Sequence, residues 1–164
     1  ILAMKNISFF LKLISFFILI FIWIFTILNY KNLPEIIPVH YDFAGNPDGF
    51  GSRKSLFLLN SLMTAIFIFL LYVAKRPNFP LLNIPQNLKD NPIISELVVS
   101  ILMVLTICLL GVISYESLLN ALGKTTGLSS ATHYLLGLLF LFIIGMMIYS
   151  WRLSKNKSKE VQSN

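Results

Sequence analysis

Four long apolar blocks constrain the fold of this chain more than any other feature. They cover residues 7–28, 55–74, 93–119 and 134–151. Each block is close to the roughly 20 residues that an α-helix needs to cross the hydrocarbon core of a bilayer. Only 12% of the residues are charged, about half the share found in soluble domains. The sequence therefore predicts an all-α integral membrane protein with four transmembrane helices, whose main partner is the lipid bilayer.

Other membrane architectures fit the blocks less well. None of the blocks alternates apolar and polar residues with a period of two, which argues against a membrane β-barrel. The first block is longer than the apolar part of a signal peptide, and no small-residue cleavage site follows it. We expect one four-helix transmembrane domain over residues 4–151, with Met4 as the start. A basic, disordered cytoplasmic tail is expected over residues 152–164.

The basic residues predict the orientation of the four spans. With four spans both termini share a side, and the loops over residues 30–54 and 120–133 share the other. Nine of the 13 Lys and Arg residues then flank the spans on the side of the termini, against four on the other side. The nine are Lys5, Lys12, Lys75, Arg76, Lys89, Arg152, Lys155, Lys157 and Lys159, and the four are Lys31, Arg53, Lys54 and Lys124. An excess of Lys and Arg marks the cytoplasmic side, so both termini are predicted to be cytoplasmic.

The net charge of +6 has the same explanation. The basic residues lie between and beyond the apolar blocks, and they form no basic stripe with interleaved aromatic residues. We therefore expect no nucleic-acid partner.

The Pro-rich segment over residues 75–92 is expected to be a loop along the membrane surface. Cys108 lies inside an apolar block and is expected to act as a small apolar side chain.

The loop between the first two spans carries local structure signals. Pro34 and Pro38 favour extended geometry in the residues before them. Residues 39–43 alternate apolar and polar side chains, with His40 and Asp42 on one face. This pattern predicts a short strand that has one polar face.

A tight turn is expected after this strand. Residues 46–49 read Asn-Pro-Asp-Gly, in which proline presets the second turn position and glycine suits the last. Gly45 and Gly51 flank this turn. Ser52 is expected to cap the second span, with Arg53 and Lys54 at the lipid headgroups.

The same loop resembles the signature of a bacterial membrane family. The residues that carry the resemblance are Leu33-Pro34-Glu35, Ile37-Pro38 and His40-Tyr41, followed by Gly45, Pro47-Asp48-Gly49 and Gly51-Ser52-Arg53. The signature is similar to the domain of unknown function 1648 (DUF1648). That domain also opens the SdpI-like immunity proteins, which protect sporulating bacilli from a secreted killing peptide.

The resemblance implies a multi-pass protein of the bacterial cytoplasmic membrane that acts as an immunity factor or signal receptor and not as an enzyme. The first functional hypothesis is therefore that the 33–54 loop binds an external peptide, an envelope ligand or a membrane protein. The candidate ligand-binding or loop-shaping residues are Pro34, Pro38, His40, Asp42, Gly45, Pro47, Asp48, Gly49, Gly51, Arg53 and Lys54.

Two further hypotheses remain open from the sequence. The chain could be a small membrane transporter or an accessory subunit whose outer loop covers a pathway between helices. It could also be a metal-dependent membrane enzyme, because His40, Glu116 and His133 are all predicted near the outer interface and are suitable zinc ligands. Their spacing matches no recognised metal motif, and no cofactor is expected.

Overall fold

Four long helices dominate the computed structural model, which describes the backbone of residues 2–162 and the side chains up to residue 155. They are α1 (Leu2–Asn29), α2 (Ser55–Val73), α4 (Pro92–Ala121) and α5 (Ser130–Gln162). A 3₁₀ turn, η1 (Tyr30–Asn32), and two strands, β1 (Ile36–Tyr41) and β2 (Pro47–Ser52), lie between α1 and α2, and the short α3 (Gln86–Lys89) precedes α4. All four long helices are long and apolar enough to cross a membrane. The prediction of four membrane-spanning helices is thus confirmed at the level of length and composition.

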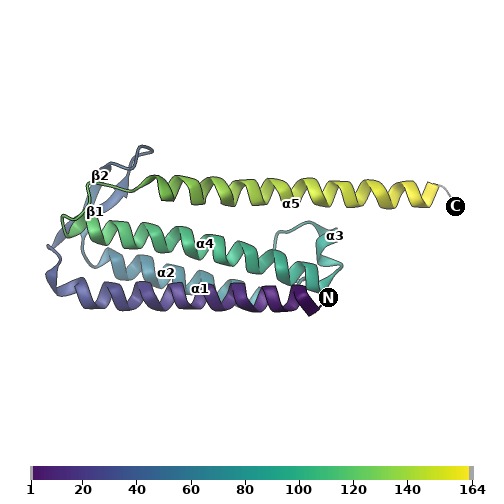
Figure 1. Cartoon of the computed structure of the whole chain (residues 1–164), viewed down its shortest axis with the longest axis horizontal. Coiled ribbons are helices and arrows are strands. Elements are labelled where there is room, and N and C mark those ends of the chain that lie inside the picture. Colours follow the sequence, from purple (N-terminus) through teal and green to yellow (C-terminus); the bar gives the residue numbers. More distant parts are fainter. Residues whose placement is uncertain (1, 163–164) are drawn as a thin grey trace.

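The helices lie side by side, and the two ends of the bundle differ (Figure 1). The strands β1 and β2 lie at one end, whereas α3 and both chain termini lie at the other. This arrangement follows from an even number of spans joined by short connections. The residues that resemble the family signature are therefore gathered at the end opposite the termini.

Three helices form the tightly packed part of the bundle. Leu19 and Ile22 of α1, Met63 of α2, and Met103 and Ile107 of α4 are buried together in one apolar cluster. The other faces of these helices expose large apolar side chains. Such faces suit a bilayer, because lipid tails are as apolar as leucine.

Helix α5 is attached more loosely than the other three. It packs along α4, and none of the residues in its most apolar stretch is buried within the chain. At the end near the termini, Asn87 of α3 donates a hydrogen bond to the Ser150 carbonyl at 2.6 Å. The Ser150 hydroxyl donates to the Asn87 side-chain oxygen at 2.7 Å in return. This reciprocal pair holds α5 against α3.

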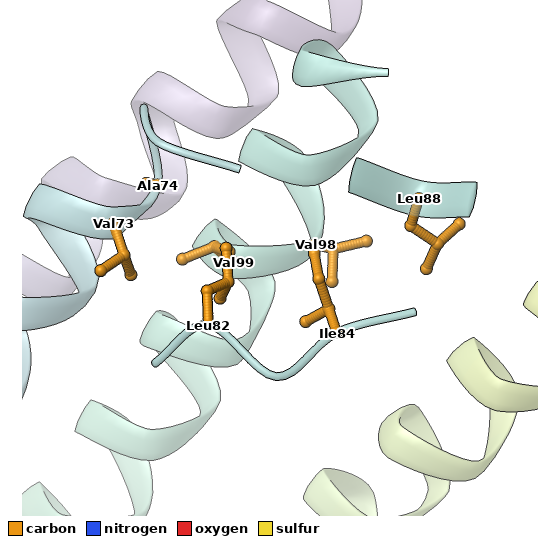
Figure 2. Packing of buried hydrophobic residues seen from close by; sticks show 7 residues of the cluster. All are labelled: Val73, Ala74, Leu82, Ile84, Leu88, Val98 and Val99. Atoms are coloured by element: carbon orange, nitrogen blue, oxygen red, sulfur yellow. The ribbon is translucent and has the colours of Figure 1, made fainter. Parts of the chain in front are cut away.

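The Pro-rich segment is mostly a loop, as expected, but it ends in the short helix α3 and packs against the bundle. Leu82, Ile84 and Leu88 are 6%, 7% and 0% exposed. Figure 2 shows Leu82 and Ile84 directed toward Val99 and Val98 of α4. The prolines exclude a long helix here, and the leucines and isoleucine between them fill the space between α2 and α4.

The C-terminal residues differ from the prediction. The sequence predicts a disordered tail from residue 152, but α5 continues through Gln162. The physical reason is that no proline or glycine follows Gly145, and Lys, Arg, Glu and Gln are good helix formers. Residues 163 and 164 of the predicted tail lie outside the described residues.

Candidate functional site

The site predicted between the first two spans is a β-hairpin. Strands β1 and β2 pair antiparallel, from Ile36 opposite Ser52 to Tyr41 opposite Pro47. The expected strand at residues 39–43 is therefore real, but it begins earlier and ends at Tyr41. The pairing register shifts on either side of His40, so the simple alternation of faces expected for His40 and Asp42 does not hold.

The turn lies at a different place from the one predicted. It is formed by residues 42–46, whereas the Pro47–Gly49 part of the predicted turn belongs to β2. The Asp42 carboxylate accepts hydrogen bonds from the Asn46 backbone N–H at 2.8 Å and from its side-chain amide at 3.1 Å. These bonds, led by the backbone one, lower the pKa of Asp42. Gly45 has φ +86°, a left-handed conformation that glycine adopts without strain.

A proline and two glycines make β2 an unlikely strand by composition, yet the packing explains them. A Cβ atom on Gly49 would lie 2.8 Å from the Cβ atom of His40, and one on Gly51 would lie 3.1 Å from a methyl group of Val39. The glycines thus leave room for larger side chains on β1. Proline at position 47 begins the strand, which is where a strand tolerates it.

The base of the hairpin is fastened to the bundle by a small apolar cluster. Leu33 and Ile37 are buried against Leu56 of α2 and Leu118 of α4. Pro34 and Pro38 flank these buried positions and keep the chain extended between them. The candidate role of the two prolines is therefore to shape the loop.

Arg53 closes the base of the hairpin. Its side chain donates to the Leu33 carbonyl at 2.8 Å and its backbone N–H donates to the Glu35 carbonyl at 2.9 Å. Its guanidinium also lies 5.0 Å from the centre of the Tyr30 ring. Arg53 thus bridges the two ends of the hairpin, while Lys54 is exposed. The expected position of both residues at the lipid headgroups stays a prediction.

Ser52 was expected to cap the second span. Its hydroxyl instead accepts a hydrogen bond from the Lys54 N–H at 3.3 Å. Helix α2 begins one residue later, without a side-chain cap. The serine therefore shapes the connection from β2 into α2.

The tip of the hairpin contacts the loop between α4 and α5. The Leu128 N–H donates to the Gly45 carbonyl at 2.8 Å, and His133 Nε2 lies 2.6 Å from the Phe43 carbonyl oxygen. A Cβ atom on Gly127 would approach the Gly45 carbonyl oxygen to 2.4 Å. The hairpin and the loop between α4 and α5 therefore form one unit.

The three metal candidates have separate partners. His40 Nδ1 lies 2.5 Å from a carboxylate oxygen of Asp48, and His133 contacts the hairpin backbone. Glu116 accepts hydrogen bonds from the Ser129 N–H at 3.0 Å and from the Thr132 hydroxyl at 3.2 Å, at the start of α5. Among the described side chains, those of residues 2–155, no group of three or more His, Cys, Asp or Glu residues is placed to hold a metal ion.

A cleft lies beneath the hairpin. Its cavity volume is about 310 Å³, and it lies between Pro38, Val39 and Tyr41 of β1 and the first turns of α2. The Tyr41 hydroxyl is buried and makes no hydrogen bond of standard geometry. Burial raises the pKa of Tyr41, and the Ser117 side chain near it partly offsets this rise.

The hairpin exposes several large apolar side chains. Phe43 is 89% exposed, Phe50 64%, Ile36 62% and Val39 44%. His40, Asp42 and Asp48 are exposed on the same hairpin. The four exposed apolar residues (Ile36, Val39, Phe43 and Phe50), of which Val39 also lines the cleft, are referred to below as the hairpin patch.

The sequence analysis missed a buried polar network below the hairpin. Asn60 of α2, with no exposed surface, donates to the Thr26 hydroxyl of α1 at 2.9 Å. Its side-chain oxygen accepts from the Ser114 hydroxyl of α4 at 2.7 Å. The Trp23 indole N–H donates to the Thr64 hydroxyl at 2.9 Å, and the Thr64 hydroxyl donates to the backbone carbonyl of Asn60. An asparagine inside an apolar block was the signal available in the sequence.

Comparison with known proteins identifies part of this region. Residues 17–64 match the family described as Domain of unknown function (DUF1648). The resemblance of the hairpin residues to DUF1648 is thereby confirmed, while the relation to SdpI-like immunity proteins stays a prediction. The DUF1648 segment contains most of α1, the whole hairpin and the first half of α2, including Asn60.

One relative matches part of the chain. An uncharacterised protein from Archaeoglobus fulgidus is 36% identical over 62 residues. The match covers 38% of this chain and 33% of the relative, so the chain spans about a third of the relative's length. No solved structure matches the chain.

Proposed function

We propose that the hairpin is the recognition element of a membrane receptor or immunity protein, and that it binds an extracytoplasmic peptide or envelope ligand. The observation that carries the proposal is the hairpin patch. Four large apolar side chains are exposed on a loop that is otherwise polar, and apolar patches bordered by polar groups mark interaction sites.

The hairpin offers two means of binding an extended peptide. In a two-stranded sheet each strand has one edge that is unpaired within the sheet, so a peptide could add as a third strand. Side chains of that peptide could then enter the cleft beside Tyr41 or pack on Phe43 and Phe50. Main-chain hydrogen bonds would supply affinity, and the cleft and patch would supply selectivity.

The way the hairpin is mounted supports a binding role. Its base is held by Arg53 and by the buried Leu33 and Ile37, and its tip is held by Gly45 and by the contact of Phe43 with His133. A loop fixed at both ends loses little conformational entropy when a ligand binds. The fold thus presents the patch in a preorganised form.

The proposal places the protein in a bacterial cytoplasmic membrane, with the hairpin outside and both termini in the cytoplasm. The test uses single cysteines in a Cys108→Ala background. Phe43→Cys at the hairpin tip should react with a membrane-impermeant maleimide in intact cells. Asn78→Cys, exposed at the other end, should react only after lysis, and the opposite pattern would reverse the orientation.

The binding function is tested by peptide challenge of a strain that lacks the gene. The strain is complemented with the wild-type chain, with Phe43→Ser/Phe50→Ser, or with Lys124→Ser, an exposed position on the neighbouring outer loop. Wild type and Lys124→Ser should restore resistance or signalling, and the double variant should not. Equal restoration by all three at equal membrane abundance would show that the patch is not the binding surface.

The transporter and metal-dependent enzyme hypotheses receive no support from residues 2–162. In the interior of the bundle, Thr26 and Ser114 each bond to the Asn60 side chain. His40, Glu116 and His133 have separate protein partners. Ligand recognition at the hairpin is the hypothesis that accounts for its exposed apolar side chains and for the contacts that fix its base and tip.

A further inference from the structure

A second pocket lies at the end of the bundle opposite the hairpin. It opens between α1 and α2, with one wall contributed by α4, and its cavity volume is about 460 Å³. On α1 its lining residues are Lys5, Phe9, Lys12 and Phe16, with Leu13 beside them. These positions recur every three or four residues and so occupy one face of the helix.

The pocket has an excess of positive charge. It is lined by Lys5, Lys12 and Lys75, and by a single carboxylate, Glu96 of α4. Lys12 forms an ion pair with Glu96. Among the side chains of residues 2–155, Lys5 and Lys75 have no acidic partner within ion-pair distance. Two positive charges therefore remain in the pocket, one from α1 and one from the turn that follows α2.

Other basic groups at the same end of the bundle are used differently. The Arg76 guanidinium lies 3.7 Å from the centre of the Tyr72 ring, and the Lys155 amine lies 5.3 Å from the centre of the Trp151 ring. Lys5 and Lys75 are both exposed and line the same cavity. Both are thus available to an anion bound in this pocket.

The pocket changes from basic to apolar along the bundle. Lys5 and Lys75 lie near the ends of their helices, whereas Phe16 and Phe67 lie further toward the middle. From Lys5 to Phe16 the helix rises about 16 Å at 1.5 Å per residue, about half the thickness of the hydrocarbon core. This is the depth of one leaflet, with the charge at the headgroup level.

We propose that this pocket binds one anionic phospholipid, with its phosphate between Lys5 and Lys75 and an acyl chain along Phe9, Phe16 and Phe67. A soluble anion would match the lysines but leave the aromatic side chains uncovered. A neutral phospholipid would match the apolar wall but leave the net charge unbalanced. Basic pockets between transmembrane helices are suited to anionic headgroups. The Lys12–Glu96 pair closes the inner side of the headgroup site and fixes α1 against α4.

The test measures thermal stabilisation of the full chain in neutral detergent by added lipid. Phosphatidylglycerol should raise the melting temperature more than phosphatidylcholine with the same acyl chains. Inorganic phosphate at the same concentration should have no comparable effect. Stabilisation by phosphate equal to that by phosphatidylglycerol would overturn the proposal in favour of a simple anion site.

The variant Lys5→Gln/Lys75→Gln should lower the preference for phosphatidylglycerol about 30-fold. That factor corresponds to about 2 kcal/mol, at about 1 kcal/mol for each basic residue near an anionic surface. Both side chains are exposed, so the variant should fold. An unchanged preference for phosphatidylglycerol would overturn the proposal.

The matched control is Lys31→Gln/Lys124→Gln, which removes the same charge from exposed positions near the hairpin end. It should keep the full preference for phosphatidylglycerol. An equal loss in the control would show that net charge, and not the pocket, attracts the lipid. Phe16→Ser should weaken stabilisation by both lipids, and no effect of this variant would remove the acyl-chain part of the proposal.

Discussion

Replacing Asn60 with leucine tests whether the buried polar network joins the three packed helices. Leucine has nearly the same branched shape as asparagine, so the change removes polar atoms with little change in volume. It eliminates one hydrogen bond to Thr26 of α1 and one from Ser114 of α4. Asn60 is the residue that bonds to both of the other helices by its side chain.

The expected loss in the free energy of unfolding follows from these two hydrogen bonds. Hydrogen bonds between transmembrane helices average about 0.6 kcal/mol and reach about 1.7 kcal/mol, so two of them give about 1 to 3 kcal/mol. The hydroxyls of Thr26 and Ser114 can turn to carbonyls one turn earlier in their own helices, so no large penalty for unpaired groups is added. The new leucine contributes little in return, because lipid offers the same apolar surroundings. We expect Asn60→Leu to lower the free energy of unfolding by about 1 to 3 kcal/mol.

The assay is reversible unfolding in mixed micelles, followed by tryptophan fluorescence. Asn29→Leu is the matched control, because Asn29 bonds only to the Phe25 carbonyl of its own helix. It should change the free energy of unfolding by less than Asn60→Leu does. A cycle with Ser114→Ala should give a coupling energy of about 0.6 to 1.7 kcal/mol. Equal effects of the two leucine variants, together with zero coupling, would refute the idea that the network holds the bundle together.

Two further predictions concern the tip of the hairpin. Gly45→Ala should cost more stability than Gly123→Ala: both glycines have positive φ, but a Cβ atom on Gly45 would lie 2.6 Å from the Leu128 carbonyl oxygen while Gly123 faces open space. Backbone strain of about 1 to 2 kcal/mol is common to both variants. The difference between their melting temperatures therefore measures the clash of the new Cβ atom with the Leu128 carbonyl oxygen. Equal melting temperatures would show that the hairpin tip moves away from Leu128 without a cost. The hydrogen bonds with Asn46 lower the pKa of Asp42 in the folded state. The stability that the Asp42 carboxylate adds to the turn is therefore fully present above its ordinary pKa of 3.8. This stability is lost as the pH falls through the lowered pKa. Hydrogen-exchange protection of the Asn46 amide should therefore decrease in acid, and a profile unchanged by Asp42→Asn would contradict this.

The helices were predictable because their signals are local. The second span, predicted over residues 55–74, is observed as Ser55–Val73, since basic pairs at both of its ends leave no other boundary. The start of α5 was predicted less accurately, because three of residues 130–133 are polar. Their helical state depends on the bonds of Glu116 to Ser129 and Thr132. A bond between separate segments leaves no periodic pattern in the sequence.

The hairpin was only half predictable for the same reason. The alternation at residues 39–43 indicated β1, but β2 has the composition of a turn. It becomes a strand because Gly49 and Gly51 allow close pairing with His40 and Val39. The contact between His133 and the Phe43 carbonyl joins residues 90 positions apart. Such a contact could not be predicted from a single sequence.

The structure also shows what the DUF1648 segment requires from the rest of the chain. Residues 17–64 supply Thr26, Asn60 and the hairpin, but Ser114 of α4 completes the polar network and Leu118 of α4 completes the cluster beneath the hairpin. Both α4 residues lie on the side of the helix that faces this segment, one turn apart along the helix axis. Helix α4 is therefore the third helix that supports the hairpin from below, whereas α5 contacts the hairpin at its tip, through His133 in its first turn. This division explains why the network and the hairpin base are buried while the most apolar stretch of α5 has no buried residue.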